Sequence, residues 1–264
     1  MGARGDARGL RARSVTVGYG KDAPILEDLS LDVLEGQLTV IVGPNACGKS
    51  TLLRSLARVL GVRSGVVELD GRALTTMNQK ELARRLGLLA QSSTAPADIL
   101  VEDLVARGRY PHQSLLRQWS AEDDEAVAWA MRQAGVEALA RRRVGELSGG
   151  QRQRVWIAMV LAQSTDIVLL DEPTTYLDLN HQLEVLRLAR RLQADGRTIV
   201  AVLHDLHLAF RYATHLVCMK EGRIVAQGAP SDIVTPALIE EVFDVPCLII
   251  EDPQTGSPLV VPRP

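Results

Sequence analysis

The stretch Gly43-Pro44-Asn45-Ala46-Cys47-Gly48-Lys49-Ser50-Thr51 decides the fold of this chain. It matches the pattern G-x-x-x-x-G-K-[ST] at every fixed position, and this pattern is typical of a phosphate-binding loop. An apolar, β-branched run at 38–42 precedes it, and apolar residues at helical spacing follow it from Leu52 to Leu60. A strand, a tight turn and a helix in this order place backbone N–H groups at the positive end of the helix, where they bind phosphate. We therefore expect this loop to bind a nucleoside triphosphate.

Two side chains of the loop have chemistry of their own. The Lys49 ammonium would reach the β- and γ-phosphates, and the Ser50 hydroxyl would hold Mg2+. The helix after the loop is expected to continue to Leu60 and to end at a C-cap glycine, Gly61. Kinases, GTPases, helicases and transporters all share such a loop, so other motifs have to distinguish these classes.

Composition narrows the class of protein. The chain has 264 residues, 46% of them hydrophobic, enough for one large domain or a domain with an inserted lobe. The net charge is -2 and the basic residues are dispersed, so nucleic acid is not an expected partner. Three scattered cysteines without a C-x-x-C pair favour a reduced, cytoplasmic protein over a disulfide or zinc scaffold.

The chain shows no sign of a membrane segment. Residues 1–13 are rich in Arg and Gly and lack an apolar centre, so we expect a flexible tail and no signal peptide. No apolar run approaches the roughly 18 to 20 residues that a spanning helix needs. We therefore expect a chain that does not cross a membrane.

Three further apolar runs end in polar side chains, as the run before the loop does. Continuous apolar strands between helical segments predict a parallel sheet covered on both faces, and ligands collect beyond the carboxyl ends of its strands. The polar residues should therefore meet the phosphates. The runs cover 86–90, 167–170 and 198–203, and they are followed by Gln91, by Asp171 and Glu172, and by His204.

Each of these polar residues has a chemical role at such an edge. Asp171 after an apolar strand matches the Walker B pattern and would bind Mg2+ directly or through water. Glu172 would orient and deprotonate the attacking water. His204 is placed to contact the γ-phosphate, and Gln91 to sense Mg2+ or the water. A strand-end cap is the commoner role for any one of them alone, but four together favour a hydrolytic site.

A second glycine-rich turn, Leu147-Ser148-Gly149-Gly150-Gln151, opens a helix that extends to Ala162. The Ser148 hydroxyl would lie at the helix N-terminus, which makes a second anion site. One nucleotide does not need two such loops in one subunit. The sensible use is therefore in trans, with two chains head to tail and each turn closing on the γ-phosphate that the other holds.

With these motifs the chain resembles, over about residues 14–230, the nucleotide-binding subunit of an ATP-binding cassette (ABC) transporter. The resemblance implies an α/β P-loop NTPase (RecA-like) core with a mainly parallel sheet and an N-terminal antiparallel β subdomain. It also implies a helical insert at about 92–162 that carries the signature turn. The ABC ATPase domain would cover 14–246, followed by a C-terminal β extension at 247–264.

The resemblance also assigns roles to single residues. Tyr19 would stack on adenine, for which an aromatic face is suited, although an aromatic residue at a strand end has a structural use as well. Asp178 would lie in the D-loop. Similar proteins usually have Gly where Ala46 stands, and the Ala46 methyl group leaves room for phosphate if φ is negative there.

Smaller elements are expected outside these motifs. Ser120 is a good helix cap with an acidic first turn after it. A hairpin with a Glu-Gly turn is expected at 216–226, a helix at about 231–242, and a strand pair at about 247–250 and 259–261.

The resemblance implies the ligands and partners as well. They are ATP, Mg2+, a head-to-tail homodimer, integral membrane permease subunits and, indirectly, a substrate-binding protein, with the chain peripheral on the cytoplasmic face of the cell membrane. Segments 108–112, 171–182 and 241–245 resemble the iron-siderophore and cobalamin import branch. A ferric siderophore is the first choice of cargo, and cobalamin, haem or another metal chelate stays open.

Two other classes carry the same loop. A soluble ABC-type ATPase acting on nucleic acid usually has a long coiled-coil insert or two fused cassettes, and this chain has neither. In a P-loop small-molecule kinase, the signature turn and His204 would have no role.

Overall fold

The structure is a computed structural model that describes residues 8–20, 22–91, 93–114, 119–175 and 177–263. Contacts divide the chain into two compact units. The first unit consists of residues 1–77 and 198–264, and the second unit of residues 78–197.

The second unit is larger than the predicted insert at about 92–162. Two strands, β6 (Leu86–Leu89) and β7 (Ile167–Asp171), pair in parallel within it. Helix α5 (Gly149–Ala162) packs on β6. The strands therefore group with the helices between them, so the insert is only part of a compact unit.

The N-terminal sheet of the first unit is antiparallel, as predicted, with strand order β2-β1-β4-β5. Leu10 and Ala12 of its central strand are buried, so the ordered chain begins before the predicted boundary at residue 14. Residues 10–13 are therefore not part of a tail, because their alternating pattern fits a half-buried strand. The tail prediction for residues 1–7 falls outside the described residues. The strands are β1 (Leu10–Val17), β2 (Leu26–Asp32), β4 (Ser64–Leu69) and β5 (Arg72–Ala73).

The second sheet of this unit has the order β10-β9-β3-β8. Its strand β3 runs parallel to both β8 and β9, and every residue of β3 and β8 is buried, which confirms the predicted apolar strands. Strands β9 and β10 form the predicted hairpin, with positive φ at Glu221 and Gly222 in its turn. The strands are β3 (Leu38–Val42), β8 (Thr198–Val202), β9 (His215–Lys220) and β10 (Arg223–Gly228).

Helix α1 (Lys49–Leu56) follows the glycine-rich loop and ends before the predicted Leu60. Arg58 takes the left-handed conformation with φ of 55° and its N–H donates to Ser55 O, while the Val59 N–H donates to Arg54 O. These bonds form a Schellman turn, usually built with glycine. The Arg58 guanidinium holds it by donating to the carbonyls of Leu74 and Met77. Gly61 is not the C-cap.

The C-terminal segment contains two short helices where one was predicted at about 231–242. Helix α8 (Pro230–Ile233) stops before α9 (Pro236–Phe243), because Pro236 has no N–H and favours an extended Thr235 before it. The predicted final strand pair is present as β11 (Cys247–Glu251) and β12 (Pro258–Pro262). Strand β12 contacts α7 (Leu206–Tyr212).

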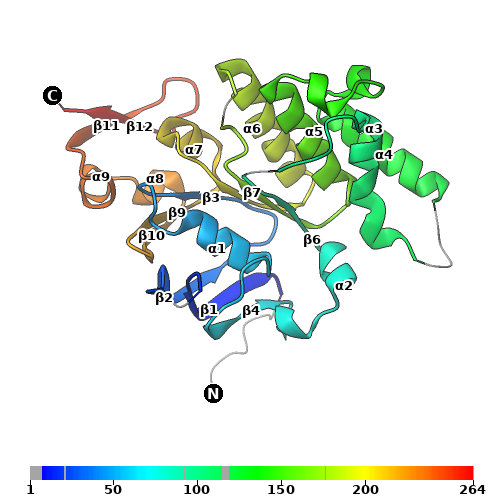
Figure 1. The fold of residues 1–264 in the computed structure, drawn as a ribbon. Coiled ribbons are helices and arrows are strands. Elements are labelled where there is room, and N and C mark those ends of the chain that lie inside the picture. Colours follow the sequence, from blue (N-terminus) through cyan, green and yellow to red (C-terminus); the bar gives the residue numbers. More distant parts are fainter. Residues whose placement is uncertain (1–7, 21, 92, 115–118, 176, 264) are drawn as a thin grey trace. The chain divides into compact units, whose positions relative to one another are not determined.

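The described residues between β6 and β7 form helices and turns. Helices α3, α4 and α5 pack on one another (Figure 1). Ser120 caps α4 with a capping box, as its sequence predicts. No helix in the described part of the chain is long and apolar enough to cross a membrane. The helices of this unit are α2 (Gln79–Ala83), α3 (Val101–Ala106), α4 (Ala121–Gln133), α5 and α6 (Leu179–Ala194), with 3-10 turns η2 (Arg107–His112), η3 (Glu137–Leu139) and η4 (Val144–Glu146).

Candidate functional site

The loop between β3 and α1 is shaped by two glycines. A Cβ atom on Gly43 would collide with the carbonyl oxygen of Met219 on β9. Gly48 has φ of 102°, and a Cβ atom there would lie 2.6 Å from Leu26 Cδ2. Both positions therefore require glycine for steric reasons, which explains why the fixed glycines of the pattern stand there.

Lys49 and the backbone of the loop form a set of donors. The Lys49 side chain is buried, and its Nζ donates to Gly43 O and Pro44 O, each at 2.8 Å. No side chain caps α1 at Gly48, so its first-turn amides keep the donor capacity of a helix N-terminus. An ammonium group beside such amides is the donor set that a triphosphate requires.

Ala46 departs from the expectation for its backbone. Its φ is +62°, in the left-handed region, whereas the sequence argument allowed for its methyl group on the assumption of a negative φ. A residue with a Cβ costs roughly 1–2 kcal/mol in this conformation. Ala46 is exposed at the tip of the loop together with Asn45, so burial of its methyl group does not offset this cost.

Cys47 is a packing residue of the loop. Its side chain is buried, and burial raises the pKa of its thiol while the nearby Lys49 opposes that shift. The thiol is therefore protonated at neutral pH and is a poor nucleophile. Thr51, the last residue of the motif, is also buried, and its carbonyl accepts a hydrogen bond from Ser55 Oγ at 2.8 Å.

The first unit brings His204 to the same edge as the loop. Strands β3 and β8 are neighbours, with Ile41 opposite Val202, so the residues that follow both strands leave the sheet at one end. His204 is exposed there. Tyr19 follows β1 with 43% of its surface exposed, and its hydroxyl lies 3.3 Å from Nη1 of Arg54 on α1.

The second unit joins two of the predicted polar residues directly. Gln91 Nε2 donates to Glu172 Oε2 at 2.8 Å, and Thr175 Oγ1 donates to the same oxygen at 3.2 Å. Asp171 is the fully buried last residue of β7, and Glu172 follows it with a strained φ of 53°. The sheet geometry thus gathers Gln91 and the Asp171-Glu172 pair, and two donors hold the Glu172 carboxylate in place.

The signature turn caps α5 as predicted. Ser148 Oγ accepts from the Gln151 N–H at 3.2 Å, and Gln151 Oε1 accepts from the Ser148 N–H at 3.1 Å. Leu147 is buried before the cap, whereas Ser148 and Gly149 are exposed. The turn therefore presents a helix N-terminus to the outside.

Asp178 is the N-cap of α6. Its Oδ1 accepts from the His181 N–H at 2.9 Å and lies 2.7 Å from His181 Nδ1. These hydrogen bonds lower the pKa of the Asp178 carboxyl. A Cβ atom on Gly150 would lie 3.4 Å from Leu177, so the start of α5 adjoins the segment before α6. Among the residues that the structure describes, no three His, Cys, Asp or Glu side chains gather as a metal site.

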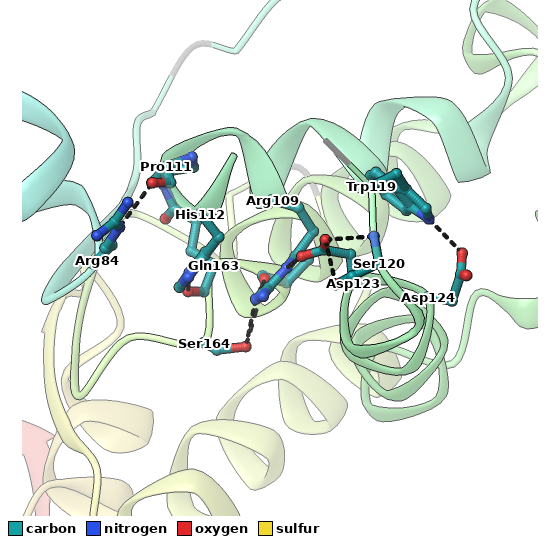
Figure 2. A network of polar contacts seen from close by, with 11 residues as sticks. Arg84, Arg109, Pro111, His112, Trp119, Ser120, Asp123, Asp124, Gln163 and Ser164 are labelled. Atoms are coloured by element: carbon teal, nitrogen blue, oxygen red, sulfur yellow. Dashed lines mark hydrogen bonds and ion pairs between the residues drawn. The ribbon is translucent and has the colours of Figure 1, made fainter. Parts of the chain in front are cut away.

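Sequence reasoning gave no role to Arg109, which the structure places at the centre of a network (Figure 2). Its side chain is 2% exposed, and Nε donates to Asp123 Oδ1 at 2.7 Å. Nη1 donates to Ala162 O at 2.9 Å and to Ser164 Oγ at 3.0 Å. Arg109 therefore links the first turn of α4 to the last turn of α5.

Two further residues of the segment 108–112, Gly108 and His112, contact the same helix end. A Cβ atom on Gly108 would collide with the carbonyl oxygen of Met159, so glycine lets η2 approach α5 closely. His112 Nε2 lies 2.8 Å from Gln163 O. Side chains thus bind two carbonyls that α5 leaves unpaired at its C-terminus. No local pattern signals this, because the contacts bridge residues about fifty positions apart.

Residues 26–175 of the chain match a sequence model of the ABC transporter family. The chain belongs to the ABC transporter family. As an ATP-binding cassette it hydrolyses ATP to power transport. The predicted family and the predicted fold class are both confirmed.

Relatives of this cassette cover nearly its whole length. The ferric enterobactin transport ATP-binding protein FepC of Escherichia coli is 55% identical over 96% of this chain and 93% of its own. The hemin import ATP-binding protein HmuV of Rhodococcus jostii is 44% identical over 96% of this chain and 86% of its own. A solved dimeric cassette bound to ADP and Pi has a TM-score of 0.74 and 25% identity, covering 84% of this chain and 98% of that one.

Proposed function

We propose that this cassette energises the uptake of a ferric siderophore through a membrane permease. The observation that carries the proposal is the 55% identity, over nearly the full length of both chains, to a protein named for ferric enterobactin transport. Import of haem is the second candidate, supported by the hemin-import relative, and cobalamin or another metal chelate is a further alternative. The cargo would be selected by the permease and a substrate-binding protein.

The predicted site residues have separate roles in the proposed hydrolysis. Lys49 and the loop from Gly43 to Thr51 bind the phosphates, and Tyr19 stacks on adenine. Ser50, Asp171 and Gln91 would supply the oxygen ligands that Mg2+ prefers, and a Mg2+ ion bound there would neutralise charge on the phosphates. Glu172 orients the attacking water and removes its proton, while His204 contacts the γ-phosphate.

The second nucleotide contact comes from a partner copy. ABC cassettes form dimers and work with permease components in importers. We place the partners head to tail, with residues 147–151 and the D-loop around Asp178 facing the partner's nucleotide. The exposed helix N-terminus at Ser148 supports this arrangement, because it can donate to an anion outside its own chain. The dimer would sit on the cytoplasmic face of the membrane, without a nucleic-acid partner.

Replacing Ser148 with Arg tests the arrangement in trans. We expect ATP turnover to fall by about a hundredfold or more, because the long side chain blocks the partner's γ-phosphate contact. ATP binding to the monomer should stay near normal when it is measured by fluorescent-nucleotide titration. Ser231→Arg, an exposed serine on α8, is the matched control. Loss of ATP binding in Ser148→Arg would contradict the role in trans.

Uptake in cells that lack this cassette tests the cargo. Radiolabelled ferric siderophore should stop accumulating, and the wild-type chain should restore it, while haem and cobalamin uptake continue. Retained siderophore uptake with lost haem uptake would favour the second candidate. Co-purification with DNA or RNA in place of a permease would instead contradict a transport function.

A further inference from the structure

A cleft of about 290 Å3 lies in the second unit, between the end of α4, the middle of α5 and the later turns of α6. Its apolar lining includes Ile157, Val185 and Leu188, which are buried. Four arginines and one glutamate complete the lining, so the cleft has an excess of positive charge although the chain as a whole is slightly acidic. The charged residues are Arg132, Arg154, Arg187, Arg191 and Glu184.

The one glutamate is already engaged. Glu184 Oε2 accepts from Arg154 Nη1 at 3.2 Å, and its Oε1 accepts from Asn180 at 3.2 Å. The Nε of Arg154 is buried without a hydrogen-bond partner among the described residues. Over the same residues, Arg132, Arg187 and Arg191 make no ion pair. Three guanidinium groups of the cleft, all of them solvent-exposed, therefore have no acidic partner among the described residues.

Helix ends account for only part of this charge. Arg132 and Arg191 lie in the last turns of α4 and α6, where the helix dipole favours cations. Arg154 is in the first half of α5, and Arg187 lies well before the end of α6, so the dipole does not explain them. Like charges around one cleft repel each other, weakly where water screens the exposed Arg132, Arg187 and Arg191, and an anion between them replaces this repulsion by attraction.

We propose that this cleft binds a small, soluble anion that bears phosphate groups. Guanidinium groups match phosphate oxygens with pairs of parallel hydrogen bonds. The cleft volume lies close to the lower limit of small-ligand pockets, roughly 300 Å3. A sugar phosphate or a pyrophosphate is of this size class.

The position of the cleft gives the ligand a consequence for turnover. Helix α5 begins at the signature turn and α6 begins at Asp178, and an anion held by Arg154 and Arg187 would tie the two helices together. This coupling rests on the proposed roles of the signature turn and the D-loop. Binding in the cleft does not depend on those roles, so it is tested separately.

Calorimetric titration of the full chain with inorganic pyrophosphate tests the binding. Lys49→Ala is the background, because it weakens the phosphate-binding loop as a competing site. We expect one pyrophosphate per chain, with affinity reduced at least about tenfold in Arg187→Gln/Arg191→Gln. The matched control is Arg141→Gln/Arg142→Gln, which removes two exposed arginines of the same unit that do not line the cleft. Equal affinity in both double variants, or no binding in the background, would overturn the proposal.

Two further measurements test whether the loss of affinity reflects misfolding and whether the bound phosphate group belongs to a lipid. Glu184→Gln should raise the affinity for pyrophosphate several-fold, because it removes the one negative charge among the described residues that line the cleft. Unchanged or weaker binding in this variant would count against an anion site. Vesicles of phosphatidylglycerol should not displace pyrophosphate, and displacement would overturn the assignment to a soluble ligand.

Discussion

Glu172→Gln is expected to lower ATP turnover by a factor of about a hundred to ten thousand, which is the range for loss of a general base. The amide cannot accept a proton from the attacking water. It can still accept hydrogen bonds from Gln91 and Thr175 in the place of Oε2, so the local structure should persist. ATP should still bind, and because it is not hydrolysed it should hold the cassette as a dimer.

Phosphate release and gel filtration with ATP measure these two effects. Glu240→Gln, an exposed residue on α9, is the matched control and should leave both unchanged. Near-normal turnover in Glu172→Gln would remove Glu172 as the base. A low turnover with no dimer would leave the base in place and count against the two-chain arrangement.

Arg109→Met is expected to lower the free energy of unfolding by about 3–5 kcal/mol at neutral pH, as removal of one partner of a buried ion pair does. Asp123 would keep its charge in a site with 1% side-chain exposure. The carbonyl of Ala162 and the hydroxyl of Ser164 would lose their donor as well. Urea unfolding followed by circular dichroism measures the loss.

Two comparisons separate this effect from a general loss of arginine. Arg141→Met removes an 85% exposed side chain whose ion pair is at the surface, so it should cost under about 1 kcal/mol. Arg109→Met/Asp123→Leu should recover a large part of the loss, because no unpaired charge stays buried. A single variant as stable as wild type would show that the network does not support the fold.

Acid should narrow the difference between Arg109→Met and wild type. Burial raises the pKa of Asp123, but hydrogen bonds from Arg109 and Ser120 lower it further, so the folded-state pKa lies below the ordinary value. The pair therefore stabilises the fold above the ordinary pKa of about 3.9 and ceases to do so as pH falls through the lower folded-state pKa. Unfolding curves at several acidic pH values would show the two proteins converging. A gap that widens on acidification would refute this account.

The sequence predicted those features whose causes are local. The loop at 43–51 follows a fixed pattern, and the apolar runs at 38–42 and 198–203 form strands that are buried on both faces. Both features can be predicted without knowing which distant residues they contact. The positive φ of Ala46 could have been predicted, because a position that is usually Gly in similar proteins indicates a positive φ. Pro236 likewise carried a clear helix-start signal within the segment predicted as one helix.

The parts that escaped prediction depend on contacts between distant segments. Arg58 can end α1 in a left-handed turn because carbonyls at Leu74 and Met77 receive its side chain. Arg109 gains its role only once α4 and α5 lie beside η2. The sequence predicted that Gln91 and Glu172 lie at the same edge of the sheet. Their hydrogen bond of 2.8 Å was not predicted, because it depends on the register of β6 and β7.

The close approach of Gly43 to β9 has a consequence for how this cassette tolerates mutation. The obstacle to any larger residue at position 43 is the main-chain oxygen of residue 219, which every amino acid carries. A change of side chain at 219 therefore cannot make room, and no compensating substitution at that neighbour exists. The steric demand for glycine at position 43 is therefore independent of which side chain stands at position 219, where Met219 itself is fully buried.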